Sequence, residues 1–119
     1  MNQSDHTHLF AAQKGMQDAI STMEKLAPAL GMAKQIVEFA SDRRRSALSV
    51  NVVPHLKAGE SAAAAEHLAR ASDEYKAEMT KILNETAAAE KTIAQWTLSK
   101  IKFECARSLL STEKSLLAL

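Results

Sequence analysis

The chain has 119 residues, with 15 lysines and arginines against 14 aspartates and glutamates, so its formal net charge is only +1. This balance gives no electrostatic reason to expect nucleic acid or an anionic membrane as the main partner. Aromatic residues make up 4% of the chain, and there are three glycines and two prolines. Such a composition is typical of long α-helices and argues against a sheet-rich fold.

The first helix is expected over residues 5–52. Apolar and small residues recur there at alternating steps of three and four, which keeps one stripe of a helix facing one partner helix. The stripe comprises Leu9, Ala12, Met16, Ala19, Met23, Leu26, Leu30, Ala33, Val37, Ala40, Arg44 and Ala47. Pro28 lies off this stripe, so we expect either a kink or two abutting helices there. Val53 and Pro54 are predicted to end the helix, because the residue before a proline is disfavoured in helical geometry.

Residues 53–72 are expected to form an elbow, with a turn at Gly59 and a short alanine-rich helix over residues 61–70. Ser61 and Ser72 are predicted to be the N-caps of two successive helices. A serine at that position accepts a hydrogen bond from a backbone N–H that otherwise has no partner. Two acidic residues follow the second serine, and they suit the positive end of a helix dipole.

Residues 73–118 contain neither glycine nor proline and are predicted to form one helix, roughly 70 Å long at 1.5 Å per residue. Its stripe toward the first helix comprises Met79, Ile82, Thr86, Ala89, Ile93, Trp96, Lys100, Phe103, Arg107, Leu110, Lys114 and Leu117. Because the two long helices have nearly equal length, an antiparallel helical hairpin is predicted. The expected fold is therefore all-α, with one domain over residues 1–119.

A second apolar stripe marks the last part of the second long helix. It comprises Leu98, Ile101, Cys105, Leu109 and Leu116. A helix that is apolar on two sides is expected to have partners on two sides. The short helix is too brief to cover the whole stripe, so we predict a homo-oligomeric bundle, with a further protein partner as an option. The sequence leaves open which face is intersubunit, and the candidate interface residues are Trp96, Ile101, Phe103, Cys105, Leu109, Leu110 and Leu117.

The residues that could catalyse a reaction or bind a metal form no recognisable constellation. His6 and His8 could chelate a metal together with Asp5, but they stand at a terminus that is expected to fray. Neither a His-Glu-x-x-His nor a Glu-x-x-His pattern is present, and one cysteine cannot build a zinc site of several thiolates. Cys105 is expected to pack as a small apolar residue. We therefore expect a non-enzymatic protein without metal or cofactor.

Basic residues on the long helices leave direct binding of single-stranded nucleic acid as the alternative function. Arg44 is expected to lie across from residues 78–85, with its stem buried and its charge reaching a carboxylate. Single-strand-binding proteins commonly add aromatic platforms for base stacking, whereas Trp96 and Phe103 are expected to be buried here. Protein association is therefore preferred. The candidates for phosphate contact are Arg43, Arg45, Lys100, Arg107 and Lys114.

The expected compartment is the cytoplasm. No apolar segment approaches the roughly 20 residues that a membrane-spanning helix needs. Residues 1–9 are polar and lack the apolar core of a signal peptide. The single cysteine cannot form an intrachain disulfide.

Three segments stand out together: residues 42–48 close the first arm, residues 59–76 form the elbow, and residues 102–114 close the second arm. In order and spacing they resemble a group of small helical proteins encoded by tailed phages and prophages. Members of that group are often encoded near single-strand annealing recombinases and single-strand-binding proteins. The resemblance covers most of the chain from Lys34 onward and implies no established activity. It suggests an accessory role in DNA recombination that is carried out by protein association.

Overall fold

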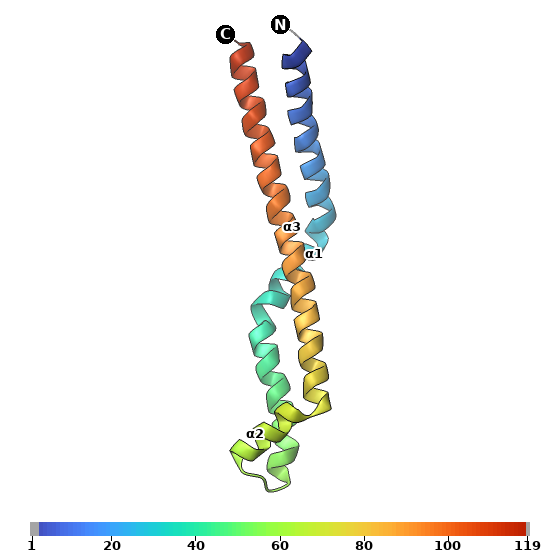
Figure 1. The fold of residues 1–119 in the computed structure, drawn as a ribbon, viewed down its shortest axis with the longest axis vertical. Coiled ribbons are helices and arrows are strands. Elements are labelled where there is room, and N and C mark those ends of the chain that lie inside the picture. The colour runs from blue at the N-terminus through green and yellow to red at the C-terminus, as the bar shows by residue number, and fades with distance from the viewer. Residues whose placement is uncertain (1–2, 119) are drawn as a thin grey trace. The chain divides into compact units, whose positions relative to one another are not determined.

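The computed structural model describes the backbone of residues 3–118 and the side chains of residues 7–118. This part of the chain holds three helices and no strand: α1 (Gln3–Lys57), α2 (Ala62–Ala71) and α3 (Asp73–Leu117). The observed α3 agrees with the expected second arm to within one residue. The prediction of an all-α hairpin of two long helices with a short elbow helix is confirmed (Figure 1).

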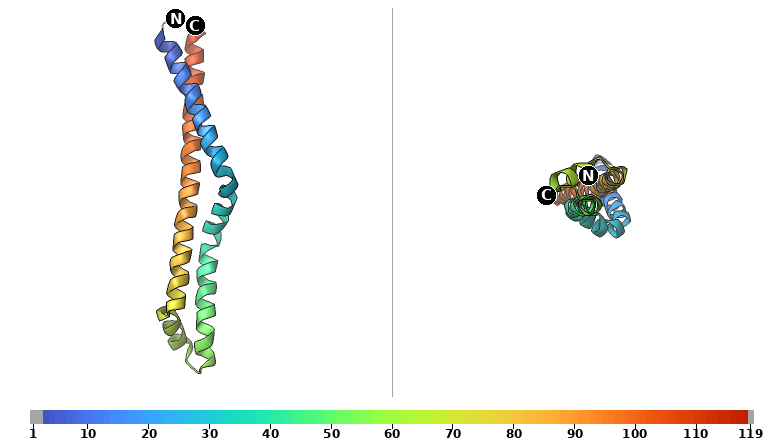
Figure 2. Two further views of the ribbon diagram at one scale, coloured as in Figure 1. Left: turned by 90° about the vertical axis from the view of Figure 1, so that its right-hand side faces the viewer. Right: turned by 90° about the horizontal axis from the view of Figure 1, so that it is seen from below.

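Contacts divide the chain into two compact units. The terminal unit consists of Met1–Gly31 and Lys91–Leu119, and the elbow unit consists of Met32–Glu90. In the terminal unit the first part of α1 lies beside the last part of α3, with the two chain ends at the same end (Figures 1 and 2). In the elbow unit the last part of α1 lies beside the first part of α3, and α2 connects them. Each unit is therefore an antiparallel helix pair.

Both prolines of the sequence lie inside α1. The helix continues without a break through Pro28, and it also passes Pro54 and ends only at Lys57. The prediction that Val53 and Pro54 end the first helix is therefore wrong. A proline forfeits one backbone hydrogen bond, and at Pro54 this loss falls in the last turn, where its carbonyl still accepts from Ala58 N–H at 3.1 Å.

A glycine, rather than a proline, sets the end of α1. Gly59 has φ 95°, a left-handed conformation that costs glycine little because it lacks a Cβ. Its N–H donates to the carbonyl of Leu56 at 3.1 Å, and the N–H of Glu60 donates to the carbonyl of His55 at 3.1 Å. These two bonds pair carbonyls that the end of a helix would otherwise leave open. The turn predicted at Gly59 is thereby confirmed.

Two serines start the next two helices. The Oγ of Ser61 accepts from the N–H of Ala64 at 3.2 Å and caps α2. The Oγ of Ser72 accepts from the N–H of Tyr75 at 3.2 Å and donates to the carbonyl of Ala69 at 2.7 Å. One hydroxyl thus joins the end of α2 to the start of α3. Both predicted N-caps are confirmed.

Alanines fill most of the contact between α1 and α3. In α1 the buried positions recur at multiples of seven residues and are Ala12, Ala19, Ala33, Ala40 and Ala47. The other members of the predicted α1 stripe are half-buried, except Arg44, which is exposed. The elbow unit also buries Ile82 completely, with Tyr75 and Met79 packed around it. In the terminal unit the buried residues among those described are Ala12, Ala19 and Ser99, so its core holds no large side chain.

Candidate interaction surface

The stripe by which α3 faces α1 changes phase after Trp96. The predicted stripe advances by four residues there and places Lys100, Arg107 and Lys114 at the contact. The structure advances by three, so these three cations are exposed, and the prediction that they interrupt the contact is wrong. Their places are taken by residues one position earlier: Ser99 is buried, and Ala106 and Glu113 are half-buried. Either position fits a helical stripe, and Ser99 and Ala106 let the helices approach more closely than Lys100 and Arg107 would.

The close approach is clearest at Gly15 of α1. A Cβ placed on Gly15 would lie 3.5 Å from the Cβ of Ala106, which is ordinary van der Waals contact. The two helices therefore meet here through residues with little or no side chain. Small residues at such a contact permit a short interaxial distance.

Four of the predicted interface residues, Trp96, Phe103, Leu110 and Leu117, lie half-buried along the contact with α1. They belong to the terminal unit, and their burial comes from the chain itself. Trp96 and Phe103, which the sequence places in the interior, are thus only partly covered. This face of α3 already has a neighbouring helix in the terminal unit.

The other predicted interface residues lie on a separate line along α3, which we call the outer stripe. At about 100° per residue its members fall within an arc of about 80°, and that arc lies about 120° around the helix from the contact with α1. All of them are exposed, and the exposed fraction of the large apolar members is between 48% and 58%. The outer stripe consists of Leu98, Ile101, Cys105, Leu109 and Leu116. Within the described part of the terminal unit, this line of apolar side chains stays exposed.

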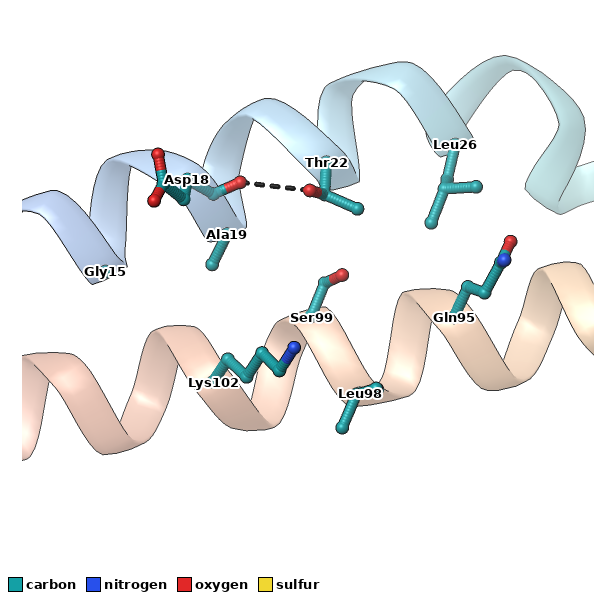
Figure 3. Close-up of a pocket in the computed structure, with 9 residues that line it drawn as sticks. All are labelled: Gly15, Asp18, Ala19, Thr22, Leu26, Gln95, Leu98, Ser99 and Lys102. Atoms are coloured by element: carbon teal, nitrogen blue, oxygen red, sulfur yellow. Dashed lines mark hydrogen bonds between the residues drawn. The ribbon is translucent and has the colours of Figure 1, made fainter.

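A groove of about 520 Å³ borders the outer stripe in the terminal unit. Figure 3 shows Ser99 pointing from α3 toward α1, and the hydroxyl of Thr22 donating to the backbone carbonyl of Asp18 at 3.0 Å. A serine nucleophile needs a base and an orienting group beside it. Among the described residues, the ionisable side chains that line this groove are Asp18 and Lys102.

The basic residues proposed for phosphate contact fall into two groups. Lys100, Arg107 and Lys114 follow one line of α3 at intervals of seven residues, about 10.5 Å along the axis. None of these three side chains forms an ion pair with a described residue.

The second group, Arg43 and Arg45, lies beside carboxylates. The Nη1 of Arg43 donates to the Oε2 of Glu85 at 2.6 Å, and the Nη1 of Arg45 lies 3.7 Å from the Oδ1 of Asp42. Arg44 lies against residues 79–86 of α3, which overlap the predicted segment 78–85. Its side chain is exposed and forms no ion pair with a described carboxylate, so the prediction of a buried stem that reaches a carboxylate is wrong. Arg43 and Arg45 belong to the elbow unit, whereas Lys100, Arg107 and Lys114 belong to the terminal unit.

The elbow unit carries a further groove, which the sequence does not reveal by composition or charge. Its volume is about 650 Å³, and it is lined by Phe39, Asp42, Arg43, Ser46, Ala47, Val50, Asn51, Glu74 and Glu78. Phe39 and Val50 give it an apolar wall, and three carboxylates border it. We call it the acidic groove. The signal that could have located it is the spacing of large apolar residues outside the α1 contact stripe, beginning at Met32.

On α2 one ion pair is exposed to solvent. The Nη2 of Arg70 donates to the Oε1 of Glu66 at 2.8 Å, one turn earlier on the same helix. This hydrogen bond raises the pKa of Arg70 above its usual value. An exposed pair of this kind contributes little to stability.

The histidines do not converge. Among the described side chains, no group of three or more His, Cys, Asp or Glu residues could hold a metal ion. His8 and His67 are exposed, and His55 is half-buried. Asp5 and His6, considered as chelators from the sequence, lie outside the described side chains.

Comparison with protein-family models, with curated proteins and with solved structures gives no match for this chain. Within the described residues, no helix combines the length and the hydropathy that crossing a membrane requires. The class defined by the fold is thus an all-α helical hairpin, and its most conspicuous surface feature is the outer stripe of α3.

Proposed function

We propose that this protein is a non-enzymatic helical interaction protein that acts by self-association and by association with a partner protein. The observation that carries the proposal is the exposed outer stripe on α3. Its four large apolar residues, Leu98, Ile101, Leu109 and Leu116, are each about half exposed. Large apolar side chains exposed along one face of a helix are typical of an interaction site.

The composition of the terminal-unit core supports the same conclusion. Its buried residues among those described are two alanines and one serine. Burial of apolar area stabilises a fold by roughly 25 cal/mol per Å², and alanine contributes little area. Packing a third helix on the remaining apolar face would bury further apolar area and so stabilise this helix pair.

The biological setting that we propose is that of a phage or prophage accessory protein in DNA recombination. Its support is the resemblance of residues 42–48, 59–76 and 102–114 to that group of helical proteins. In this setting the protein would act on recombination proteins through helix–helix contacts rather than through chemistry of its own.

Light scattering of the wild type and two variants tests the proposed association. Ile101→Glu places a charge on the outer stripe, while Ser111→Glu places the same charge on an exposed polar position away from it. We expect an oligomer for the wild type and for Ser111→Glu, and a mass near the 12.9 kDa of one chain for Ile101→Glu. Equal masses for all three proteins would show that the outer stripe is not part of the interface.

A second candidate function, direct binding of single-stranded nucleic acid, is favoured by one observation. Lys100, Arg107 and Lys114 form an exposed row without ion-pair partners among the described residues. Fluorescence anisotropy of labelled oligonucleotides across a salt series tests it, because phosphate contacts weaken steeply with salt. Binding that disappears in Lys100→Ala/Arg107→Ala/Lys114→Ala would support this function, and absence of binding at low salt would reject it.

A further inference from the structure

Three exposed apolar residues of α1 line up on one face of the elbow unit. They are Met32, Phe39 and Val50, with exposed fractions between 50% and 70%. Successive intervals are seven and eleven residues, so at about 100° per residue the three positions fall within about 20° of one another. Phe39 and Val50 form the apolar wall of the acidic groove.

Three members of the outer stripe show the same pattern in the opposite order. Leu98, Leu109 and Leu116 are separated by eleven and then seven residues, and they also fall within about 20° of one another. In each helix the full span is 18 residues, or about 27 Å. Eighteen residues make five turns at 3.6 residues per turn, so both lines run straight along their helices and need no supercoil to stay in contact.

We propose that the occupant of the acidic groove is the outer stripe of a second copy of this chain, packed antiparallel to α1. This inference rests on the proposed self-association, in which the outer stripe is one of the two contacting surfaces, and it names the acidic groove as the other. In the antiparallel orientation the intervals coincide, so that Leu98 faces Val50, Leu109 faces Phe39 and Leu116 faces Met32. In the parallel orientation, the α3 intervals of eleven and then seven residues would lie beside the α1 intervals of seven and then eleven. Leu109 and Phe39 would then be four residues out of register.

The acidic groove and Lys102, which borders the outer stripe, carry opposite charges. Asp42, Glu74 and Glu78 border the groove, while its one cation, Arg43, is held by Glu85. Of the charged residues in the terminal-unit part of α3, Lys91, Lys102 and Glu113 lie within about 60° of the line through Leu98 and Leu116. Lys100, Arg107 and Lys114 lie on the opposite side of the helix.

Lys102 is the cation of α3 that the proposed register brings to the edge of the groove. It borders the outer stripe, about 40° around the helix from Leu98. In the proposed register it lies level with Ser46 of the groove and one helical turn from Asp42, within reach of a lysine side chain. A second copy therefore supplies both apolar side chains for the groove wall and a cation for the groove edge.

Disulfide cross-linking between two single-cysteine variants tests this arrangement. In a Cys105→Ser background, Phe39→Cys and Leu109→Cys are prepared separately, one with an affinity tag that changes its mass, and are refolded together and oxidised. A disulfide requires Cα atoms within about 7 Å. We expect mixed dimers to exceed dimers of either variant with itself by at least tenfold. Val50→Cys with Leu98→Cys is a second pair in the same register and should behave alike.

An out-of-register pair provides the control. Val50→Cys and Leu109→Cys lie eleven residues, about 16.5 Å, apart in the proposed arrangement and should not cross-link. A circular dichroism spectrum equal to that of the parent protein would show that each variant keeps its helical structure. Rapid cross-linking of Leu109→Cys with itself would overturn the assignment of the groove and retain self-association through α3. A monomeric mass of the wild type in light scattering, with no cross-link in any mixture, would overturn both proposals.

Discussion

Arg43 of α1 donates through Nη1 to the Oε2 of Glu85 of α3 at 2.6 Å, across 42 residues of sequence. It is the only ion pair between these two helices within the described residues. The pair stands beside the contact of Ala40, Ala47 and Ile82. It therefore links the two helices at the edge of the core of the elbow unit, where it favours one register of the alanine contact over its neighbours.

Removal of this pair is expected to have a small effect on stability. About a third of each side chain remains exposed, so solvent screens the attraction. A double-mutant cycle with Arg43→Ala and Glu85→Ala should give a coupling of about 0.5 kcal/mol in urea unfolding, decreasing at high salt. The same cycle on Arg45 and Asp42, which lie 3.7 Å apart and are more exposed, should give almost none.

Ile82 should contribute more to stability than any other single side chain of the core, because it is the largest one that is completely buried. We expect Ile82→Ala to lower the free energy of unfolding by about 3 kcal/mol. Leu83, the next residue, is 68% exposed, and Leu83→Ala should change the free energy by less than about 0.5 kcal/mol. Similar losses in the two variants would contradict the observed orientation of α3.

Gly59 should be difficult to replace. Its φ of 95° is unfavourable for a residue with a Cβ, even though nothing lies within 4 Å of the position that a Cβ would occupy. Gly59→Ala is therefore expected to destabilise the protein by about 1 kcal/mol through the backbone alone. Ala58→Gly is the matched control beside it. An unchanged melting temperature in Gly59→Ala would mean that α1 ends differently in solution.

Gly15 and Gly31 offer a comparison of close packing in α1. Alanine at either position should stabilise the helix by about 0.5–1 kcal/mol, because glycine is flexible and the space for a Cβ exists. Substitution by leucine should have different effects on stability at the two positions. Gly15→Leu would press on Ala106 and cost about 1–3 kcal/mol, whereas Gly31→Leu meets nothing within 4 Å. Equal effects of the two leucine variants in thermal unfolding would contradict the close approach at Gly15.

Local signals in the sequence predict much of the fold. Ser61 and Ser72 cap their helices because a hydroxyl placed before a helix pairs a free N–H whatever the surroundings are. The alanines from Ala12 to Ala47 recur at multiples of seven residues, and a partner helix buries them for that reason. The outer stripe of α3 is equally local, since its periodicity lies in the order of the residues.

Other features are not local, and sequence reasoning misses them. Pro54 predicts a helix end, but a left-handed Gly59 with its two hydrogen bonds ends α1 instead. Arg44 fits the α1 stripe by spacing, yet the neighbouring Arg43 pairs with Glu85 because a carboxylate of α3 happens to lie there. Lys100 and Ser99 fit the α3 stripe almost equally well. Only the distance between the two helices selects the serine, because a lysine would have to bury its charge there.

The sequence by itself determines that this chain forms two long helices and a capped elbow, with apolar residues on two sides of α3, because helix propensity, capping and periodicity act over a few turns. The tertiary structure decides which of those sides has a neighbour within the chain and which is left exposed. It also brings Phe39 and Val50 beside Glu74 and Glu78 to form the acidic groove. That choice depends on how closely two helices approach, which is set by side chains distant in the sequence and by the cost of burying a charge.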